Sequence, residues 1–330
     1  MKKIKETISR IMKDTSDGSS ISYNQDKDIF YSKKKEFNKE NTVSNFFVND
    51  EQSDNVTLKQ KKFYEDVKFP NYDDLETYGD LIEKASQQNH LASILDKSIG
   101  FNSKVLEVGC GTGQLSLFLK RYNREICGVD ISSPSLMLAE DFRTRNEIDN
   151  VVFFKMNIFN MQFKDKVFDY VISNGVLHHT FNTELAFEKI LKPLKVNGNI
   201  VIGLYHKYGR LYTNFKQLLI QNFGEGFKFL DKRTIDPNIS EEKRYAWLKD
   251  QYKNPHETSH TLNEVKSWFK KYGVEYLTSI PFNKIDKNTN LFKENSDTKN
   301  VSLFREMSLM FSLSQIKEGG FFIVVGKKLK

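Results

Sequence analysis

A cluster of alternating glycines gives the strongest chemical signal in the sequence. Residues 107–113 read EVGCGTG, directly after a predicted strand and before a predicted helix. Alternating glycines let the backbone turn tightly and approach a ligand, with the first N–H groups of the helix exposed nearby. Asp130 ends the next predicted strand about twenty residues after the first glycine, where a carboxylate can accept hydrogen bonds from ribose hydroxyls. The pattern predicts a nucleoside-binding turn.

The spacing of these glycines separates two classes of nucleotide site. A dinucleotide-binding loop reads G-x-G-x-x-G, whereas residues 107–113 follow E-x-G-x-G-x-G. A nicotinamide-dependent oxidoreductase is therefore disfavoured. Two purely structural interpretations stay open: the glycines could serve only as a strand-to-helix turn, and Asp130 could cap a helix opened by residues 131–134 (ISSP).

The histidines are the candidates for proton transfer. His178 and His179 follow the fourth predicted strand, and His256 and His260 form an H-E-x-x-H pattern. That pattern binds zinc only on a helix, where positions i and i+4 share one face. Here the pattern follows a proline and precedes Thr261, the predicted N-cap of a helix, so both histidines are expected in a loop. We therefore expect no metal site. The candidates for catalysis are His256, His260 and His179. Alternatively, the side chains of the loop histidines only bond to nearby backbone.

Composition excludes several protein classes. The chain has 330 residues, a net charge of +7 and a mean hydropathy of −0.55. No stretch approaches the roughly 18–20 apolar residues of a membrane span. Two cysteines, Cys110 and Cys127, are too few for a disulfide scaffold. We expect a cytoplasmic protein whose charge permits nucleic acid or anionic substrates without requiring them.

Strands and helices alternate through the centre of the chain. The predicted strands are 104–108, 125–129, 151–155, 167–173 and 198–205, and the helices between them are 114–121, 135–145 and 183–191. This alternation predicts a parallel sheet that is covered on both faces.

The segments outside this alternation predict five parts. Residues 1–60 are dense in Lys, Asn, Asp and Ser, which predicts a poorly ordered or loosely docked arm whose aromatic residues pack in part on the body. The other parts are an N-terminal helical lid segment (61–100, with a helix over 80–95), a core (101–206), a helical cap insertion (207–260, with helices over 212–223 and 240–253) and a C-terminal completion of the sheet (261–330, with strands over 274–280 and 320–325).

Several ordered stretches resemble a known family. KVLEVGCGTGQ, GVDIS, FFKMNIFNMQF, FDYVISNGVLHHT and LKPLKVNGNIVIGLY, over roughly residues 100–206, look like the successive motifs of class I S-adenosylmethionine-dependent methyltransferases. The NGVLHH stretch resembles the ubiquinone-biosynthesis-like, small-molecule branch. The resemblance implies an α/β, Rossmann-like doubly wound sheet of seven strands with the last strand antiparallel. It implies S-adenosylmethionine as the cofactor, contacted by Glu107, Gly109, Gly111, Gly113, Asp130, Ile131, Asn157, Ile158 and Asn174.

Two asparagines deserve comparison with the family pattern. Asn157 stands where many members have Asp near the adenine amino group, and an amide oxygen can still accept that hydrogen bond. Asn174 occupies the position that faces the sulfonium and the substrate in the family. The sequence lacks the Asn/Asp-Pro-Pro-Tyr motif of many amino-directed nucleic-acid methyltransferases, which counts against that type.

Aromatic and basic residues near the expected cofactor are substrate candidates. Tyr72 and Tyr78 precede the core, while Tyr205, Tyr208 and Arg210 follow the fifth strand at the edge where such folds bind ligands. Arg210 could hold a carboxylate or phosphate with two parallel hydrogen bonds.

The sequence thus predicts a methyltransferase that acts on an oxygen or nitrogen atom of a small metabolite. Two alternatives stay open: an RNA (tRNA or rRNA) methyltransferase, suggested by the charge, and a non-catalytic cofactor-binding subunit that supports a partner. No sequence feature indicates an oligomeric state or the identity of the acceptor.

Overall fold

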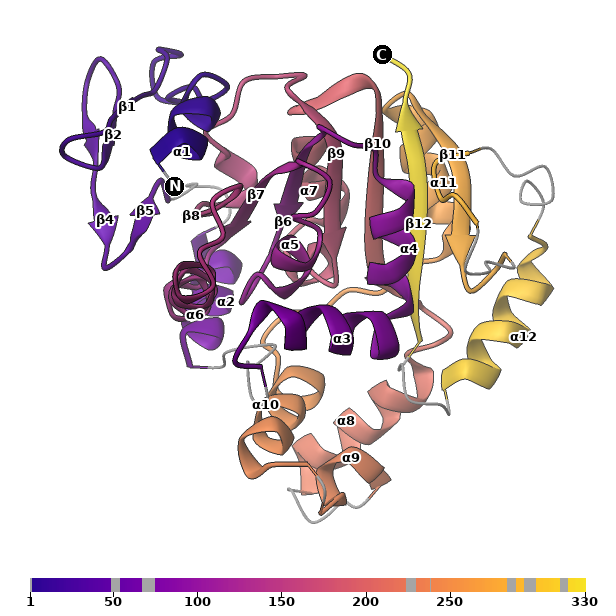
Figure 1. Cartoon of the computed structure of the whole chain (residues 1–330). Coiled ribbons are helices and arrows are strands. Elements are labelled where there is room, and N and C mark those ends of the chain that lie inside the picture. The colour runs from indigo at the N-terminus through magenta and orange to yellow at the C-terminus, as the bar shows by residue number, and fades with distance from the viewer. Residues whose placement is uncertain are drawn as a thin grey trace.

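The computed structural model describes residues 2–48, 54–66, 75–223, 230–237, 239–283, 289–293, 301–314 and 320–330. A mixed sheet runs through the molecule with the strand order β11-β12-β10-β9-β6-β7-β8-β5-β4 (Figure 1). Its strands are β4 (Lys39–Glu40), β5 (Val43–Asn45), β6 (Lys104–Val108), β7 (Glu125–Asp130), β8 (Val151–Lys155), β9 (Phe168–Asn174), β10 (Leu194–Tyr205), β11 (Val274–Ile280) and β12 (Phe321–Lys328).

The central strands have the predicted topology. Strands β10, β9, β6, β7 and β8 pair in parallel, and β12 pairs antiparallel with both β10 and β11. This confirms the seven-stranded doubly wound sheet with its last strand antiparallel. Strands β5 and β4 extend the sheet beyond β8, where β5 pairs in parallel.

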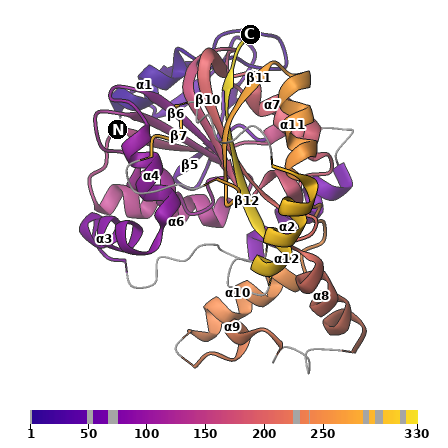
Figure 2. The same cartoon turned by 90° about the vertical axis from the view of Figure 1, so that its right-hand side faces the viewer.

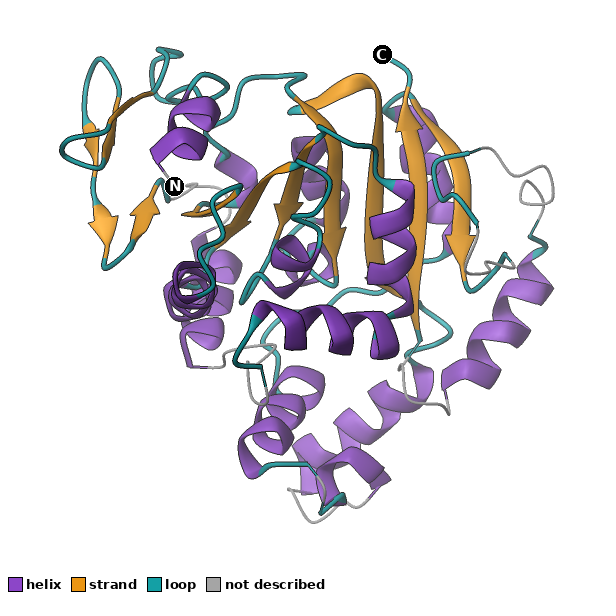
Figure 3. Cartoon of the chain, viewed as in Figure 1, coloured by secondary structure: helices purple, strands orange, loops and turns teal. Residues whose placement is uncertain are grey.

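Helices cover both faces of the sheet (Figure 3). One face packs against α1 (Lys2–Ser9), α7 (Thr183–Leu191) and α11 (Leu262–Lys271). The other packs against α4 (His90–Ser98), α5 (Gln114–Phe118) and α6 (Ser133–Arg145). Successive strand residues point to opposite faces, so Leu106 joins the first core and Val105 the second. Burial on both faces explains why these strands are continuously apolar.

The N-terminal segment is more ordered than the poorly ordered or loosely docked arm expected for residues 1–60, and its aromatic residues pack on the body as expected. Its β1 (Ser22–Asn24), β2 (Ile29–Tyr31) and β3 (Glu36–Phe37) form a small sheet beside the edge of the main one (Figure 1). The rings of Phe30 and Phe46 are buried and pack edge-on against Phe154 of β8, at centroid distances of 5.3 and 5.2 Å. Isolated aromatic anchors hold this segment, and they leave no periodicity for a sequence pattern to detect.

The helix predicted over residues 80–95 is two helices. They are α3 (Tyr78–Gln88) and α4, and Asn89 lies between them. The Asn89 side chain accepts a hydrogen bond from the N–H of Ala92 at 3.0 Å and so caps the second helix. The chain therefore bends at Asn89 instead of continuing straight.

A group of helices lies beyond the edge where the parallel strands end. It contains α8 (Leu211–Phe223), α9 (Lys232–Ile235) and α10 (Glu241–Tyr252), and α12 (Leu303–Ser314) lies beside α8 (Figure 2). The first and third match the helices predicted over 212–223 and 240–253. Helix α2 (Asp54–Asp66) lies near this edge and contacts α6. Among the described residues, no helix has the length and apolar character needed to cross a bilayer.

Candidate active site

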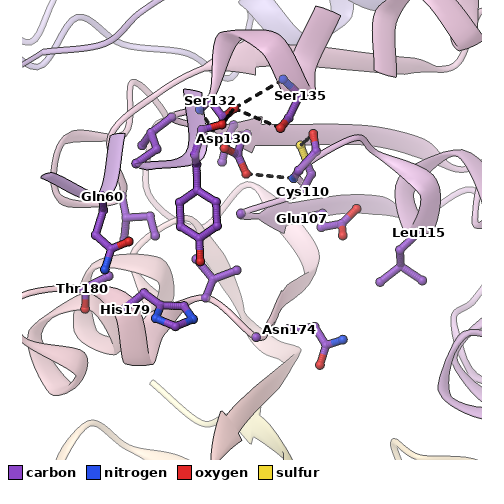
Figure 4. Close-up of a pocket in the computed structure, with 18 of the residues that line it drawn as sticks. Gln60, Glu107, Cys110, Leu115, Asp130, Ser132, Ser135, Asn174, His179 and Thr180 are labelled. Carbon is purple, nitrogen blue, oxygen red and sulfur yellow. Dashed lines mark hydrogen bonds between the residues drawn. The ribbon is translucent and has the colours of Figure 1, made fainter. Parts of the chain in front are cut away.

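The carboxyl ends of the central strands meet at one cavity of about 470 Å³ (Figure 4). This volume lies within the range of small-molecule sites. Of the residues predicted to bind the cofactor, all but one line the cavity, and His179 and Tyr205 line it too. The exception is Gly113.

The glycine loop needs its glycines for two different reasons. Gly109 has φ +76°, and a Cβ there would lie 2.3 Å from Cγ2 of Val176, so only glycine lets the loop approach the cavity wall. Gly113 has φ +73°, and a Cβ there would lie 2.5 Å from Cζ of Phe153 on β8. Gly113 therefore serves the packing of α5 on the sheet and does not line the cavity, and its contact with the cofactor stays a prediction.

Asp130 fastens the glycine loop to the end of β7. Its Oδ2 accepts a hydrogen bond from the N–H of Gly111, and its Oδ1 accepts one from the N–H of Ser132, both at 2.8 Å. The N-cap of α6 is Ser132, so Asp130 does not cap that helix. Burial raises the pKa of the Asp130 carboxyl, although these N–H groups oppose the rise.

Glu107 is the second acid of the cavity. Its side chain is buried, and the hydroxyl of Ser116 donates a hydrogen bond to its Oε2. Burial raises the pKa of Glu107 to about 7, and the nearby charge of Asp130 adds to the rise. No lysine or arginine is among the described residues that line the cavity. Two acids without a cation fit a ligand that carries an ammonium group and hydroxyls.

Asn157 shows why an amide stands at this position. Its Oδ1 accepts a hydrogen bond from the N–H of Phe159 at 3.0 Å, and its Nδ2 donates one to the carbonyl of Val48 at 3.2 Å. An aspartate would lack that donor. Asn157 thus ties the cavity wall to the end of the N-terminal segment, while apolar side chains complete this wall, namely Ile131, Met156, Ile158 and Phe159.

The paired histidines have different surroundings. His179 lines the cavity, and its Nδ1 lies 3.1 Å from the carbonyl oxygen of His256. His178 is 1% exposed, and its ring lies 4.2 Å from that of Tyr205 between centroids. Burial holds the pKa of His178 well below its ordinary value, so this ring is neutral and packs behind the cavity wall.

The other predicted catalytic histidines do not line the cavity. Both lie in the segment between α10 and α11, outside any helix, which is why they do not form the zinc pattern. His260 bonds through Nδ1 to Glu264 and through Nε2 to Thr258, at 2.9 and 3.0 Å. His256 approaches the cavity through its main-chain oxygen, which lies near Nδ1 of His179. No group of three or more His, Cys, Asp or Glu in the described part of the chain is placed to hold a metal ion.

Arg210 is not placed to hold an anionic substrate, which corrects the sequence-based expectation. The side chain is fully buried, and its guanidinium makes a double hydrogen bond to the Glu257 carboxylate, with N–O distances of 2.7–2.9 Å. It also donates to Oε1 of Gln251 at 2.6 Å and lies 3.8 Å from the ring centroid of Tyr205. Its donors are therefore directed at α10 and at the segment between α10 and α11.

Only one of the described tyrosine candidates lies at the cavity. Tyr205 lines the cavity, whereas Tyr78 and Tyr208 do not. The Tyr78 ring packs 4.3 Å from Nζ of Lys120, and Tyr208 packs against His206. Tyr72 lies outside the described residues.

Helix α2 supplies lining residues that the sequence analysis missed. They are Thr57, Gln60 and Tyr64, whose spacing of three and four residues places them on one helix face. That spacing could have revealed the helix, but the composition suggested a poorly ordered or loosely docked arm up to residue 60 and a helical segment only from residue 61. The hydroxyl of Ser132 donates to the carbonyl of Tyr64 at 2.8 Å and joins α2 to the turn after Asp130.

Together the sheet topology and the cavity define a class I, S-adenosylmethionine-dependent methyltransferase domain. A family described as "Methyltransferase domain" matches residues 100–271, just over half of the chain. The chain therefore belongs to this family.

This chain aligns with only part of the length of the curated relatives that it matches. Phosphoethanolamine N-methyltransferase 2 of Caenorhabditis elegans is 32% identical over 120 residues, which are 36% of this chain and 27% of that protein. A probable S-adenosylmethionine-dependent methyltransferase of Saccharomyces cerevisiae is 24% identical over 219 residues, covering 53% of this chain and 70% of the relative. The structure of PKMT2 from Rickettsia typhi has the same fold, with a TM-score of 0.52, 15% identity, and coverage of 72% of this chain and 54% of that one.

Proposed function

We propose that this protein transfers a methyl group from S-adenosylmethionine to an oxygen or nitrogen atom of a small metabolite bound in the cavity. The proposal rests on one observation: two acids and a histidine line the same cavity, to which α2 contributes one wall. When bound, S-adenosylmethionine supplies a methyl group activated by a sulfonium. The NGVLHH stretch favours the ubiquinone-biosynthesis-like, small-molecule branch within the family.

We assign the residues that line the cavity to different parts of the cofactor and the acceptor. Glu107 and Asp130 accept hydrogen bonds from the ammonium group and the ribose hydroxyls of the cofactor, and the apolar wall that includes Ile131 and Ile158 contacts its base. Asn174 lies at the end of β9 and lines the cavity, and we assign it the position that faces the sulfonium and the acceptor. Holding the acceptor close and aligned supplies much of the rate acceleration.

His179 is the candidate general base. A carbonyl oxygen can only accept a hydrogen bond, so the contact with His256 places the proton of the neutral ring on Nδ1 and leaves the lone pair on Nε2. A hydroxyl acceptor has a proton to lose, and a positioned base removes it as the methyl group is transferred. Tyr205 lines the cavity and is a further candidate for contact with the acceptor.

A methyl-label partition assay tests the proposal. The purified chain is incubated with S-adenosylmethionine labelled in its methyl group and with either a low-molecular-mass metabolite extract or a mixture of tRNA and rRNA. We expect label in the metabolite fraction, and much less of it with the Asp130→Ala variant at a subsaturating concentration of S-adenosylmethionine. Label in RNA alone would contradict the small acceptor. Cofactor binding without any transfer would favour a supporting subunit instead.

A further inference from the structure

Gln60 has a hydrogen-bonding atom that the protein leaves unused. The side chain belongs to α2, lines the cavity and is 4% exposed. Its Nε2 donates to Oδ1 of Asn254 at 2.7 Å and to the carbonyl oxygen of His256 at 2.8 Å. Its Oε1 is buried and has no hydrogen-bond partner. Figure 4 shows this amide oxygen directed toward the interior of the cavity.

The orientation of the Gln60 amide is fixed by its partners. Oδ1 of Asn254 also accepts from the N–H of His256 at 3.1 Å, while Nδ2 of Asn254 bonds to the hydroxyl of Tyr64 at 3.1 Å. Oδ1 and the carbonyl of His256 are both acceptors, so the nitrogen of Gln60 must face them and the oxygen must face away. A buried acceptor without a partner is costly, and a bound ligand that donates a hydrogen bond removes this cost.

Gln60 and His179 are joined through one atom. The carbonyl oxygen of His256 accepts from Nε2 of Gln60 and lies 3.1 Å from Nδ1 of His179. Gln60 thus donates to this oxygen and to Oδ1 of Asn254, and His179 donates from Nδ1 to the same oxygen. Each side chain keeps one acceptor, Oε1 of Gln60 and Nε2 of His179. Figure 4 shows Gln60 and His179 on one side of the cavity and Glu107 and Leu115 on the other.

The charges of the cavity determine which ligand suits these two acceptors. Its described lining has two acids and neither a lysine nor an arginine, and Arg210 is occupied by Glu257. An anionic group would be buried there without a cationic side chain among the described lining residues. We propose that Gln60 and His179 form an acceptor-binding pair that selects molecules presenting a hydroxyl or protonated amine, and no anionic group, next to the methyl donor. This inference rests on the proposed function and names the chemical class of its acceptor.

Fragment binding tests the pair without knowledge of the natural acceptor. The protein is saturated with S-adenosylhomocysteine, and ligand-detected NMR measures the binding of small phenols and amines, such as catechol and tyramine, and of carboxylates of matched size, such as benzoate and 4-hydroxyphenylacetate. We expect the phenols and amines to bind and the carboxylates not to bind. Gln60→Met should weaken binding of the phenols and amines about tenfold, whereas Gln87→Met, on the exposed face of α3, should not change it.

A second variant separates recognition from damage to α2. Gln60→Glu keeps acceptor oxygens, adds a negative charge and loses the donors to Asn254 and His256, so it should shift the ratio of affinities toward amines and away from phenols. If the substitution only loosened α2, the binding of amines and the binding of phenols would weaken alike. Three results would overturn the inference. Gln60→Met could bind phenols and amines as tightly as the wild type does, the wild type could prefer carboxylates, or the wild type could bind neither phenols nor amines. Methyl label found only in RNA would contradict the proposed function, while Gln60-dependent fragment binding would still be observed.

Discussion

The Nδ1 atom of His179, which follows β9, lies 3.1 Å from the main-chain oxygen of His256, 77 residues later in the chain. This contact fixes the tautomer of an imidazole that lines the cavity. It also means that the segment between α10 and α11 contacts the site through its backbone, whereas the sequence had suggested a role for the His256 side chain.

Replacement of His179 tests its role as base. His179→Asn removes the lone pair of Nε2, and we expect kcat to fall roughly a hundredfold to ten-thousandfold. Affinity for S-adenosylmethionine should stay unchanged, because the cofactor groups are assigned to Glu107 and Asp130. The matched control is His90→Asn, at the exposed start of α4. A fall in cofactor affinity equal to the fall in kcat would argue for a purely structural role.

Glu107 should lower the stability of the unliganded protein above neutral pH. Its pKa is about 7 in the folded chain and 4.5 ordinarily, so the folded state binds this proton more tightly than the unfolded state does. The resulting stabilisation is present below about pH 4.5 and is lost as the pH rises through 7. In calorimetric melting, Glu107→Gln should therefore melt higher than wild type at pH 8 and nearly equally at pH 4.5.

The same substitution should weaken cofactor binding, because the neutral amide cannot pair with an ammonium group. The exposed control Glu36→Gln should change neither property. A lower melting temperature for Glu107→Gln at pH 8 would show that the buried carboxylate stabilises the fold instead.

Arg210 should contribute to stability and not to acceptor affinity. Arg210→Met leaves the Glu257 carboxylate without its partner, and removing one member of a buried pair costs about 3–5 kcal/mol. Denaturant unfolding should detect this loss, and adding Glu257→Leu should recover part of it. Unchanged stability together with a raised KM for the acceptor would restore Arg210 as a substrate anchor.

Asn157 should couple the cavity wall to the N-terminal segment. Asn157→Asp removes the donor to Val48 and places a carboxylate beside that carbonyl, so we expect a loss of about 1–3 kcal/mol. Hydrogen exchange should accelerate at β4 and β5 before the central strands. Uniform acceleration across the sheet, or none, would contradict this coupling.

Local patterns predicted the parts of the fold that depend on neighbouring residues. The strand predicted over residues 104–108 is β6, and the glycine loop and Asp130 lie where their spacing indicated. The edge strands β4 and β5 were missed because they are two and three residues long and are held by pairing with distant segments.

The same limit explains the errors in the candidate site. Arg210 has the chemistry of an anion-binding residue, and only the fold brings Glu257 and Gln251 to its guanidinium. Gln60 belongs to no motif, and its role depends on Asn254 and on the His256 carbonyl, nearly two hundred residues away in the chain. Long-range partners of this kind cannot be identified from spacing.

The cavity's assignment as the cofactor site is tested most directly by calorimetric titration of wild type and Asp130→Ala with S-adenosylmethionine, with NADH as the control ligand. We predict one S-adenosylmethionine per chain, no binding of NADH, and an affinity at least roughly tenfold lower for the variant, since we assign the ribose contact to Asp130 and its carboxylate fastens the glycine loop. Melting curves of both proteins would verify that the variant is folded. Equal affinity of the two proteins, or binding of NADH in place of S-adenosylmethionine, would contradict the account.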